Sequence, residues 1–261
     1  MAKPQALILR SAGTNCDNET AFGLEQAGFA AHRQHVLALS ERPDDLKDYQ
    51  LLVVAGGFSY GDDVSAGKIL ANQLLHRLGE ALNRFIEADK LVLGICNGFQ
   101  VLLKSGLLPG GRADAAAAGR EATLGWNDSG RFEDRWVHVR VDTDRCAFLT
   151  EGDVLAMPVA HGEGKFVCDR EQTLSALRHA GQIALRYVGA DGQSGEFPIN
   201  PNGSDDDVAG VCDPTGRVLG LMPHPERFCR IEQHPRWTRQ QLTRADGAEL
   251  FRNAFAYLQT S

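Results

Sequence analysis

Cys96 has the sequence surroundings of a catalytic nucleophile. It lies in the pattern Gly-x-Cys-x-Gly, between Gly94 and Gly98, directly after the apolar run of residues 91–93. The run predicts a short buried strand, and the pattern predicts a tight strand-to-helix turn, a nucleophile elbow, that lifts the central side chain above a sheet. Glycine on both sides removes side chains that would collide at such a turn. A free cysteine is more often a buried structural residue, but these glycines favour catalysis, and a helix N-terminus here favours a thiolate.

His224 and Glu226 supply the base that a cysteine nucleophile needs. They lie in Met-Pro-His-Pro-Glu-Arg, residues 222–227, after the last apolar run. Two prolines exclude a helix, so an extended segment is expected, with both side chains on the same side. A carboxylate beside an imidazole fixes its tautomer and supports its protonated form. Cys96, His224 and Glu226 in this order therefore predict a catalytic triad.

Two other patterns resemble metal or phosphate sites but are incomplete. His161 and Glu163 form the His-x-Glu of zinc deaminases, but the Pro-Cys-x-x-Cys that completes that site is absent, so a supporting or loop role is expected for His161. Residues 61–69 resemble a phosphate-binding loop, with one residue too many between the glycines and Ile69 where a hydroxyl should bind magnesium. We therefore expect no metal, nucleotide or other cofactor on this chain.

The elements predicted around these residues are those of an α/β protein. Apolar runs at residues 6–9 and 51–55 predict strands, and residues 69–86 predict an amphipathic helix. After the first strand, Asp17 or Asn18 is expected to cap the N-terminus of a helix that Gly28 closes. Strands that alternate with helices predict a doubly wound, mostly parallel sheet with helices on both faces, and the site should lie at the carboxyl ends of its strands.

The second half of the chain predicts an antiparallel extension of this sheet. Residues 136–141 alternate between apolar and polar, and a polar second strand is also expected earlier, near residues 32–37. Later strands are expected at residues 154–158, 183–188, 208–212 and 218–221, before a final amphipathic helix that contains Leu250 and Leu258. Two motif-poor segments, residues 112–122 and 233–247, are expected at the surface. One domain over residues 1–261 is favoured.

Composition limits the classes of partner. The net charge of −7 and the pI near 5.6 argue against a general nucleic-acid binder, which needs a basic face. No signal peptide and no apolar run of membrane-spanning length is present, so we expect no membrane partner and a cytoplasmic location. The six cysteines lack paired spacing and should be reduced thiols. Small molecules and proteins are the expected partners.

Several of these segments together resemble a known family. The elbow, the glycine-rich loop of residues 56–62 and the ending of residues 223–227 resemble class I, triad-type glutamine amidotransferases, which have a flavodoxin-like fold. Residues 127–132, 160–164 and 200–204 are similar to segments of the glutaminase subunits of phosphoribosylformylglycinamidine synthase. The likeness runs from about Leu7 to Arg227.

The resemblance implies roles for individual residues. The Cys96 thiolate would attack the carboxamide of L-glutamine to form a thioester, and His224 would protonate the departing ammonia and then activate water, oriented by Glu226. Backbone N–H groups of Gly57, Phe58 and Asn97 would stabilise the oxyanion. The positions similar to those that hold the glutamine are Gly56, Gln100, Asn127, Ser129 and Arg131.

The resemblance also implies partners. Ammonia would pass to a separate synthetase subunit, which binds ATP and magnesium and converts formylglycinamide ribonucleotide to formylglycinamidine ribonucleotide in de novo purine biosynthesis, and a small accessory subunit completes the complex. Three alternatives remain open: the glutaminase of another synthetase, a stand-alone thiol amidase, and a non-catalytic module. The last would be expected to lack a member of the triad, and all three are present.

Overall fold

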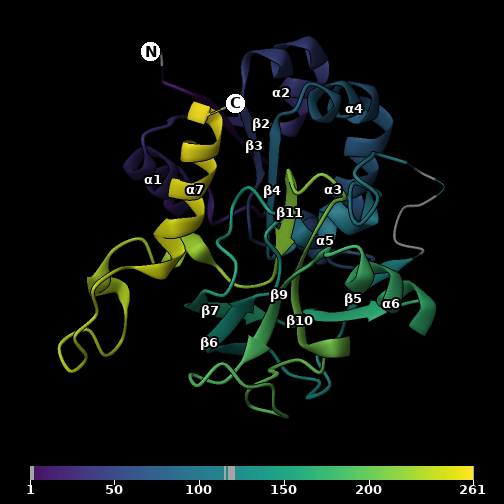
Figure 1. The fold of residues 1–261 in the computed structure, drawn as a ribbon. Coiled ribbons are helices and arrows are strands. Elements are labelled where there is room, and N and C mark those ends of the chain that lie inside the picture. The colour runs from purple at the N-terminus through teal and green to yellow at the C-terminus, as the bar shows by residue number, and fades with distance from the viewer. Residues whose placement is uncertain (1–2, 115, 117–120, 261) are drawn as a thin grey trace.

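The computed structural model describes residues 3–114, 116 and 121–260 and is built around a nine-stranded sheet (Figure 1). Its strand order is β2-β1-β3-β4-β11-β10-β9-β6-β7, and β5 and β8 form a separate antiparallel pair. The strands are β1 (Gln5–Arg10), β2 (Ala30–His35), β3 (Leu51–Val54), β4 (Leu91–Ile95), β5 (Ala122–Gly125), β6 (Glu133–Val141), β7 (Val154–His161), β8 (Lys165–Cys168), β9 (Ile183–Val188), β10 (Val208–Cys212) and β11 (Val218–Leu221).

Strands β2, β1, β3, β4 and β11 pair in parallel, and the strands from β10 to β7 continue the sheet in antiparallel pairs. Strands β1, β3, β4 and β11 are almost wholly buried, as expected for parallel strands covered on both faces. The predicted α/β class, parallel half and antiparallel extension are confirmed. Because parallel strands end at one edge, the loops after these four strands lie together.

Helices cover both faces of the parallel half. Helices α1 and α7 lie side by side on one face, and α3 and α5 lie on the other (Figure 1). The helices are α1 (Asp17–Ala27), α2 (Val36–Glu41), α3 (Lys68–Gln73), α4 (Gly79–Glu87), α5 (Asn97–Lys104), α6 (Glu171–His179) and α7 (Asp246–Thr260). In the described part of the chain, no helix is long and apolar enough to span a membrane. All six cysteines are free thiols.

Two predictions about helices need correction. The helix predicted at residues 69–86 is α3, a π-helical turn (Leu74–Leu78) and α4, although its apolar stripe is buried as expected. Helix α1 begins after Cys16, without a side-chain cap, because Asp17 instead forms ion pairs with Arg10 and Arg33.

The other differences from the predicted elements concern the residues at which an element begins or ends. The predicted second strand ends at His35, because the imidazole of His35 accepts a hydrogen bond from the N–H of Leu37 and caps α2. Of the segment 112–122, residues 115 and 117–120 lie outside the described residues, and Ala122 already belongs to β5. Residues 235–241 of the segment 233–247 form an exposed loop that extends away from the sheet, at the lower left in Figure 1, whereas Ala245 and Gly247 are buried and α7 begins at Asp246.

Candidate active site

The turn between β4 and α5 is a nucleophile elbow. Cys96 has φ 51° and ψ −105°, a backbone conformation that side chains rarely adopt, and it is the residue immediately before α5. A Cβ at Gly98 would lie 1.9 Å from the Val54 carbonyl oxygen, and one at Gly94 would lie 2.8 Å from the Gly98 carbonyl oxygen. Both glycines are therefore required by close backbone approach. The Cys96 N–H bonds the carbonyl of Leu221 at 2.8 Å, which fixes the elbow to β11.

His224 and Glu226 form the predicted pair, although the segment is not extended. Residues Pro225–Arg227 form a short 3-10 turn, which proline at its first position permits. The turn still brings His224 Nδ1 to 2.6 Å from Glu226 Oε1, and both side chains are buried. The His224 N–H also bonds the Pro158 carbonyl on β7. The contact was predicted correctly, but the backbone conformation behind it was predicted wrongly.

The surroundings of His224 favour its protonated form. Burial alone would lower its pKa, but the negative charges of the Glu226 carboxylate and of a Cys96 thiolate raise the pKa well above its ordinary value, with a smaller contribution from a hydrogen bond to Cys16. Cys96 Sγ also lies 3.6 Å from the Ala160 carbonyl oxygen. The structure thus brings the three residues of the predicted triad together, in an arrangement suited to a thiolate–imidazolium pair.

Cys16 is a second thiol beside His224 that sequence reasoning did not single out. Its Sγ lies 4.0 Å from His224 Nδ1 and accepts a hydrogen bond from Arg227 Nη2 at 3.3 Å. One ligand atom each from Cys16, His224 and Glu226 lies within 4.8 Å of the others. A cation there would have to displace the His224–Glu226 hydrogen bond beside the Arg227 guanidinium, so we assign no metal. Cys16 has 1% exposure and lines neither cavity at Cys96.

Two adjoining cavities meet at Cys96. The larger, of about 400 Å³, is bounded by the loops after β3 and β7 and by α5, and the smaller, of about 190 Å³, contains His224 and Arg227. Gly57, Phe58 and Cys96 line both. The further residues lining the larger cavity include Asp62, Gln100, Trp126, His161 and Glu163. The glycine-rich loop thus lies beside Cys96, as predicted.

The backbone N–H groups predicted to bind the oxyanion belong to residues beside Cys96, but at least one of them already donates a hydrogen bond within the protein. Gly57 has φ 143°, and a Cβ there would lie 2.7 Å from the Gly13 carbonyl oxygen. The Phe58 N–H donates to that same Gly13 oxygen at 2.9 Å, so it would have to leave this contact to reach an oxyanion. Asn97 is the first residue of α5, and its N–H has no carbonyl one turn earlier in the helix. The oxyanion roles of Gly57, Phe58 and Asn97 stay a prediction.

A hydrogen-bond network connects the walls of the larger cavity. The Asn97 side chain accepts from the Ser59 N–H and donates to Asp62 Oδ1 and to Gln100 Oε1, at 3.2, 3.1 and 2.8 Å. Gln100 Nε2 donates to the Glu163 carbonyl at 2.6 Å. The side chains of Asn97 and Gln100 therefore tie the loops after β3 and β7 to α5. Gly56 lies under the ring of His224, since a Cβ there would be 3.0 Å from its Cε1.

Two carboxylates, those of Asp62 and Glu163, line the larger cavity. Burial raises the pKa of Asp62, and the nearby Glu163 carboxylate raises it further. Lys104 lies behind them, with Nζ 3.9 Å from Glu163 Oε2, and its own pKa is lowered by burial. No arginine or lysine is among the described residues that line this cavity. The described lining of this cavity therefore contains two carboxylates and no cation, and Lys104, outside the lining, pairs with Glu163.

Asn127, Ser129 and Arg131 do not line the cavities at Cys96. The Asn127 amide is fully used inside the protein, because its Nδ2 donates to the carbonyls of Arg131 and His161 and its Oδ1 accepts from the Gly164 N–H. Ser129 Oγ donates to Glu133 Oε1. The structure does not bring these three side chains to Cys96, and their role in holding glutamine stays a prediction that this geometry does not support.

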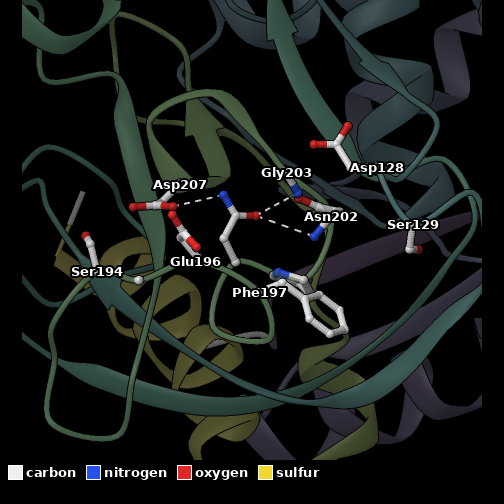
Figure 2. A pocket seen from close by; sticks show the side chains of 11 residues that line it. Asp128, Ser129, Ser194, Glu196, Phe197, Asn202, Gly203 and Asp207 are labelled. Carbon is white, nitrogen blue, oxygen red and sulfur yellow. Dashed lines mark hydrogen bonds between the residues drawn. The ribbon is translucent and has the colours of Figure 1, made fainter.

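A larger cavity, of about 760 Å³, lies elsewhere and is lined partly by Asp128 and Ser129. Figure 2 shows this cavity, with Asp207, Asn202 and Gly203 among the labelled residues. Asn200 Nδ2 donates to Asp207 Oδ1, and Asn200 Oδ1 accepts from the N–H groups of Asn202 and Gly203. No thiol or imidazole is among the residues that line it. Asn202 Nδ2 in turn donates to the Gly164 carbonyl, so this segment supports the loop after β7. We therefore assign the chemistry to the smaller cavities at Cys96.

Comparison with known proteins agrees with this site. The model of the CobB/CobQ-like glutamine amidotransferase domain matches residues 3–258. Phosphoribosylformylglycinamidine synthase subunit PurQ of Dehalococcoides mccartyi is 44% identical over 257 residues, which cover 97% of each chain, and that of Methanococcus maripaludis is 38% identical over 267 residues, again 97% of each.

A solved structure agrees as well. A chain in the structure of PurLQS from Thermotoga maritima superposes with a TM-score of 0.74 and 32% identity, covering 98% of this chain and 100% of that one. The chain therefore belongs to the CobB/CobQ-like glutamine amidotransferase family and, within it, to the family of phosphoribosylformylglycinamidine synthase subunit PurQ.

Proposed function

We propose that this chain is the glutaminase subunit of phosphoribosylformylglycinamidine synthase and supplies ammonia for the ATP-dependent amidine synthesis carried out by a separate synthetase subunit. The observation that carries the proposal is the strained elbow of Cys96 against the buried His224–Glu226 pair, in a chain of the PurQ family. The whole chain, residues 1–261, acts as one glutaminase domain. ATP and magnesium belong to the synthetase, and this chain needs no cofactor of its own. The expected location is the cytoplasm.

The reaction follows from the arrangement of the three side chains. Cys96 Sγ attacks the carboxamide carbon of glutamine, and the carbonyl electron pair moves to oxygen, where backbone N–H groups stabilise it. When the carbonyl re-forms, the C–N bond breaks and His224 Nε2 gives its proton to the nitrogen, which leaves as ammonia. Neutral His224 then takes a proton from water, which attacks the thioester and releases glutamate. Glu226 holds the imidazole in the tautomer that both steps need.

The charge of the cavity indicates how glutamine is oriented. Asp62 and Glu163 are the two carboxylates that line the larger cavity. The α-ammonium group of glutamine is the part of the substrate that would compensate this charge. We propose that these two carboxylates bind the α-ammonium group, which leaves the carboxamide pointing toward Cys96.

Replacing Asp62 by asparagine is therefore expected to raise the KM for glutamine by about tenfold or more, with a smaller effect on kcat, because a charge-assisted hydrogen bond is worth roughly 1.5–3 kcal/mol. Steady-state glutaminase assays of the complex measure both constants. Asp63→Asn is the matched control, since the Asp63 side chain is exposed and does not line the cavity. Equal KM values for the two variants would contradict the assignment.

The mouth of the cavity carries exposed apolar side chains. Phe58, Val64, Trp126 and Phe132 line it, and Val64 and Trp126 are 90% and 70% exposed. Such a patch is typical of a protein–protein interface. Ammonia must reach another active site without loss to water, so we propose that the synthetase subunit docks over this mouth. A small accessory subunit completes the complex.

The variant Trp126→Ser is expected to weaken binding to the synthetase subunit by about tenfold or more, because a buried tryptophan at an interface typically contributes more than about 2 kcal/mol. Isothermal titration of the two purified subunits, with the accessory protein present, measures the Kd. Trp237→Ser is the control, since Trp237 is 48% exposed but does not line this cavity. Loss of affinity in both variants alike, or in neither, would argue against this docking face.

The alternatives differ in partner and substrate. Reconstitution with the large synthetase subunit should give glutamine-dependent amidine synthesis. A synthetase of another pathway should gain no glutamine-dependent activity from this chain. A stand-alone thiol amidase would instead turn over varied amides without a partner. Trapping of a glutamyl thioester on Cys96, detected by mass spectrometry, would exclude a non-catalytic module. Failure of both glutamine-dependent synthesis and thioester trapping would refute the proposed function.

A further inference from the structure

His161 is a buried histidine in the cavity of Cys96 that the reaction above does not use. It is the last residue of β7 and is 3% exposed. Its Nδ1 lies 3.0 Å from Asn127 Oδ1, and its Nε2 has no hydrogen-bond partner among the residues that the structure describes. A buried polar atom without a partner costs free energy, which makes it a candidate for contact with a ligand.

The protonation of His161 follows from the contacts of Asn127. Asn127 Nδ2 lies 2.9 and 2.8 Å from two backbone carbonyl oxygens, so this atom is the amide nitrogen and Oδ1 is the acceptor. His161 Nδ1 must then carry the hydrogen that it shares with Asn127 Oδ1. Burial, and then the charge of His224, lower the pKa of His161 to about 3, so the imidazole is neutral. Its Nε2 therefore carries a lone pair that can accept a hydrogen bond.

His224 offers the opposite group. Its Nδ1 is bonded to Glu226, its Nε2 is buried, and this Nε2 also has no hydrogen-bond partner in the described part of the chain. Because its pKa is raised, Nε2 carries a hydrogen to donate. The two cavities that contain His161 and His224 share Cys96. Cys96 therefore lines both cavities, one of which contains an imidazole that can accept a hydrogen bond and the other an imidazole that can donate one.

Few ligands fit such a pair. The carboxamide nitrogen of glutamine is planar and has no available lone pair. After Cys96 Sγ attacks, this nitrogen becomes a tetrahedral amine, with a lone pair for the His224 N–H and two N–H bonds of its own. The pair therefore matches the reacting nitrogen in the intermediate better than in the substrate, which is what lowers a barrier.

We propose that His161 and His224 together bind the nitrogen that leaves glutamine, His224 Nε2 by donating its proton and His161 Nε2 by accepting an N–H hydrogen bond. The C–N bond breaks as the proton of His224 passes to nitrogen, and the carbonyl re-forms from the oxyanion. His161 takes no proton, so the nitrogen leaves as neutral ammonia. This inference rests on the proposed glutaminase function, and it assigns His161 to binding of the leaving group.

Two substitutions test the roles of the two ring nitrogens of His161 one at a time. His161→Asn places an amide N–H near the position of Nδ1, which keeps the contact with Asn127 and removes Nε2. His161→Gln places an amide oxygen near Nε2 and loses the Nδ1 contact.

Two substrates compare a leaving group that has N–H bonds with one that has none. L-Glutamine releases a nitrogen that bears N–H bonds, whereas glutamate γ-methyl ester releases the methoxide oxygen, which bears no hydrogen. The complex with the synthetase and accessory subunits is assayed with each.

In the complex, His161→Asn is expected to lower kcat for glutamine by about tenfold to a hundredfold, the usual consequence of losing one buried hydrogen bond. Turnover of the ester should change by less than about threefold, and KM for glutamine should change little. His161→Gln should retain a ratio of glutamine to ester turnover close to that of the unchanged protein. If His161→Asn does not fold, His161→Ala, which removes both ring nitrogens, carries the test, because the ratio should fall in that variant and an unchanged ratio would refute the inference.

The opposite pattern would overturn the inference. If His161→Gln is the more damaged variant and slows both substrates equally, His161 acts only through its Nδ1 contact with Asn127. A glutamine-to-ester ratio that is unchanged in His161→Asn, or one that falls in His161→Gln, would also refute a leaving-group role. Failure of the proposed function is distinguishable, because the unchanged complex would then hydrolyse neither substrate.

Discussion

Alanine in place of Cys96 is expected to lower glutamine-dependent amidine synthesis by at least about 10⁴-fold and to leave ammonia-dependent synthesis almost unchanged. The sulfur is the only atom of the site that forms a bond to the substrate carbon, so its loss removes the thioester pathway entirely. The synthetase can still use ammonia from solution, because its own site is not altered. Both activities are measured on the same preparation of the complex, with glutamine or with an ammonium salt as nitrogen donor.

Cys16→Ala is the matched control for this substitution. Cys16 is a buried thiol that also touches His224, but it does not line the cavities at Cys96 and lies on the Nδ1 side of the imidazole. We expect a loss of about tenfold or less, from a small change in the position of His224. Loss of glutamine-dependent synthesis in Cys16→Ala but not in Cys96→Ala would make Cys16 the nucleophile. Equal loss of the two nitrogen sources would contradict the assignment of Cys96.

The catalytic core of the site could be read from the sequence because local backbone geometry dictates it. The clashes that a Cβ would cause at Gly94 and Gly98 come from chain reversal at the elbow and from close contact with β3, and only glycine satisfies them. His224 and Glu226 are two residues apart, so a contact between them needs no knowledge of the fold. Even there, the 3-10 turn was not foreseen, since proline is compatible with both conformations.

The rest of the site depends on contacts between distant segments. The family resemblance predicted a ligand-binding role for Asn127, but its amide is used by the carbonyls of residues 131 and 161 and by the N–H of Gly164. Conversely, Asp62 and Glu163 are 101 residues apart in the sequence and meet only because the loops after β3 and β7 reach the same cavity. No local pattern reports such pairs.

The fold also contains some elements that local sequence predicts and others that it does not. The fully apolar strands β3 and β4 were predicted almost to the residue, because parallel strands buried on both faces have a distinct composition. The short strands β5 and β8 were not predicted, since each has four residues and they stabilise mainly each other. The π-helical turn between α3 and α4 was missed, because it keeps the spacing of the buried leucines.

Glutamine in place of Glu226 is expected to lower kcat by about 10²- to 10⁴-fold, with the protein still folded. Glu226 is fully buried, its Oε1 is bonded to His224, and its Oε2 has no partner in the described part of the chain. The amide has the same shape but no charge. It can also turn its NH₂ group toward Nδ1, which would force the hydrogen onto Nε2 and leave the imidazole unable to accept a proton from water.

The pH dependence of the variant distinguishes the loss of charge from a loss of structure. The Glu226 carboxylate raises the pKa of His224, so His224 is protonated to higher pH in the unchanged protein. Without the charge, burial dominates and the pKa of His224 falls. Since release of ammonia needs protonated His224, the alkaline limb of the pH profile of kcat/KM should move to lower pH.

Glu232→Gln removes an exposed carboxylate six residues further along the chain and should leave that limb in place. A Glu226→Gln enzyme that is slow but has an unshifted alkaline limb would show that Glu226 orients the imidazole without contributing charge. A shift to higher pH would contradict the assignment of His224 as the acid, because removing a negative charge beside an imidazole can only make its protonated form less stable.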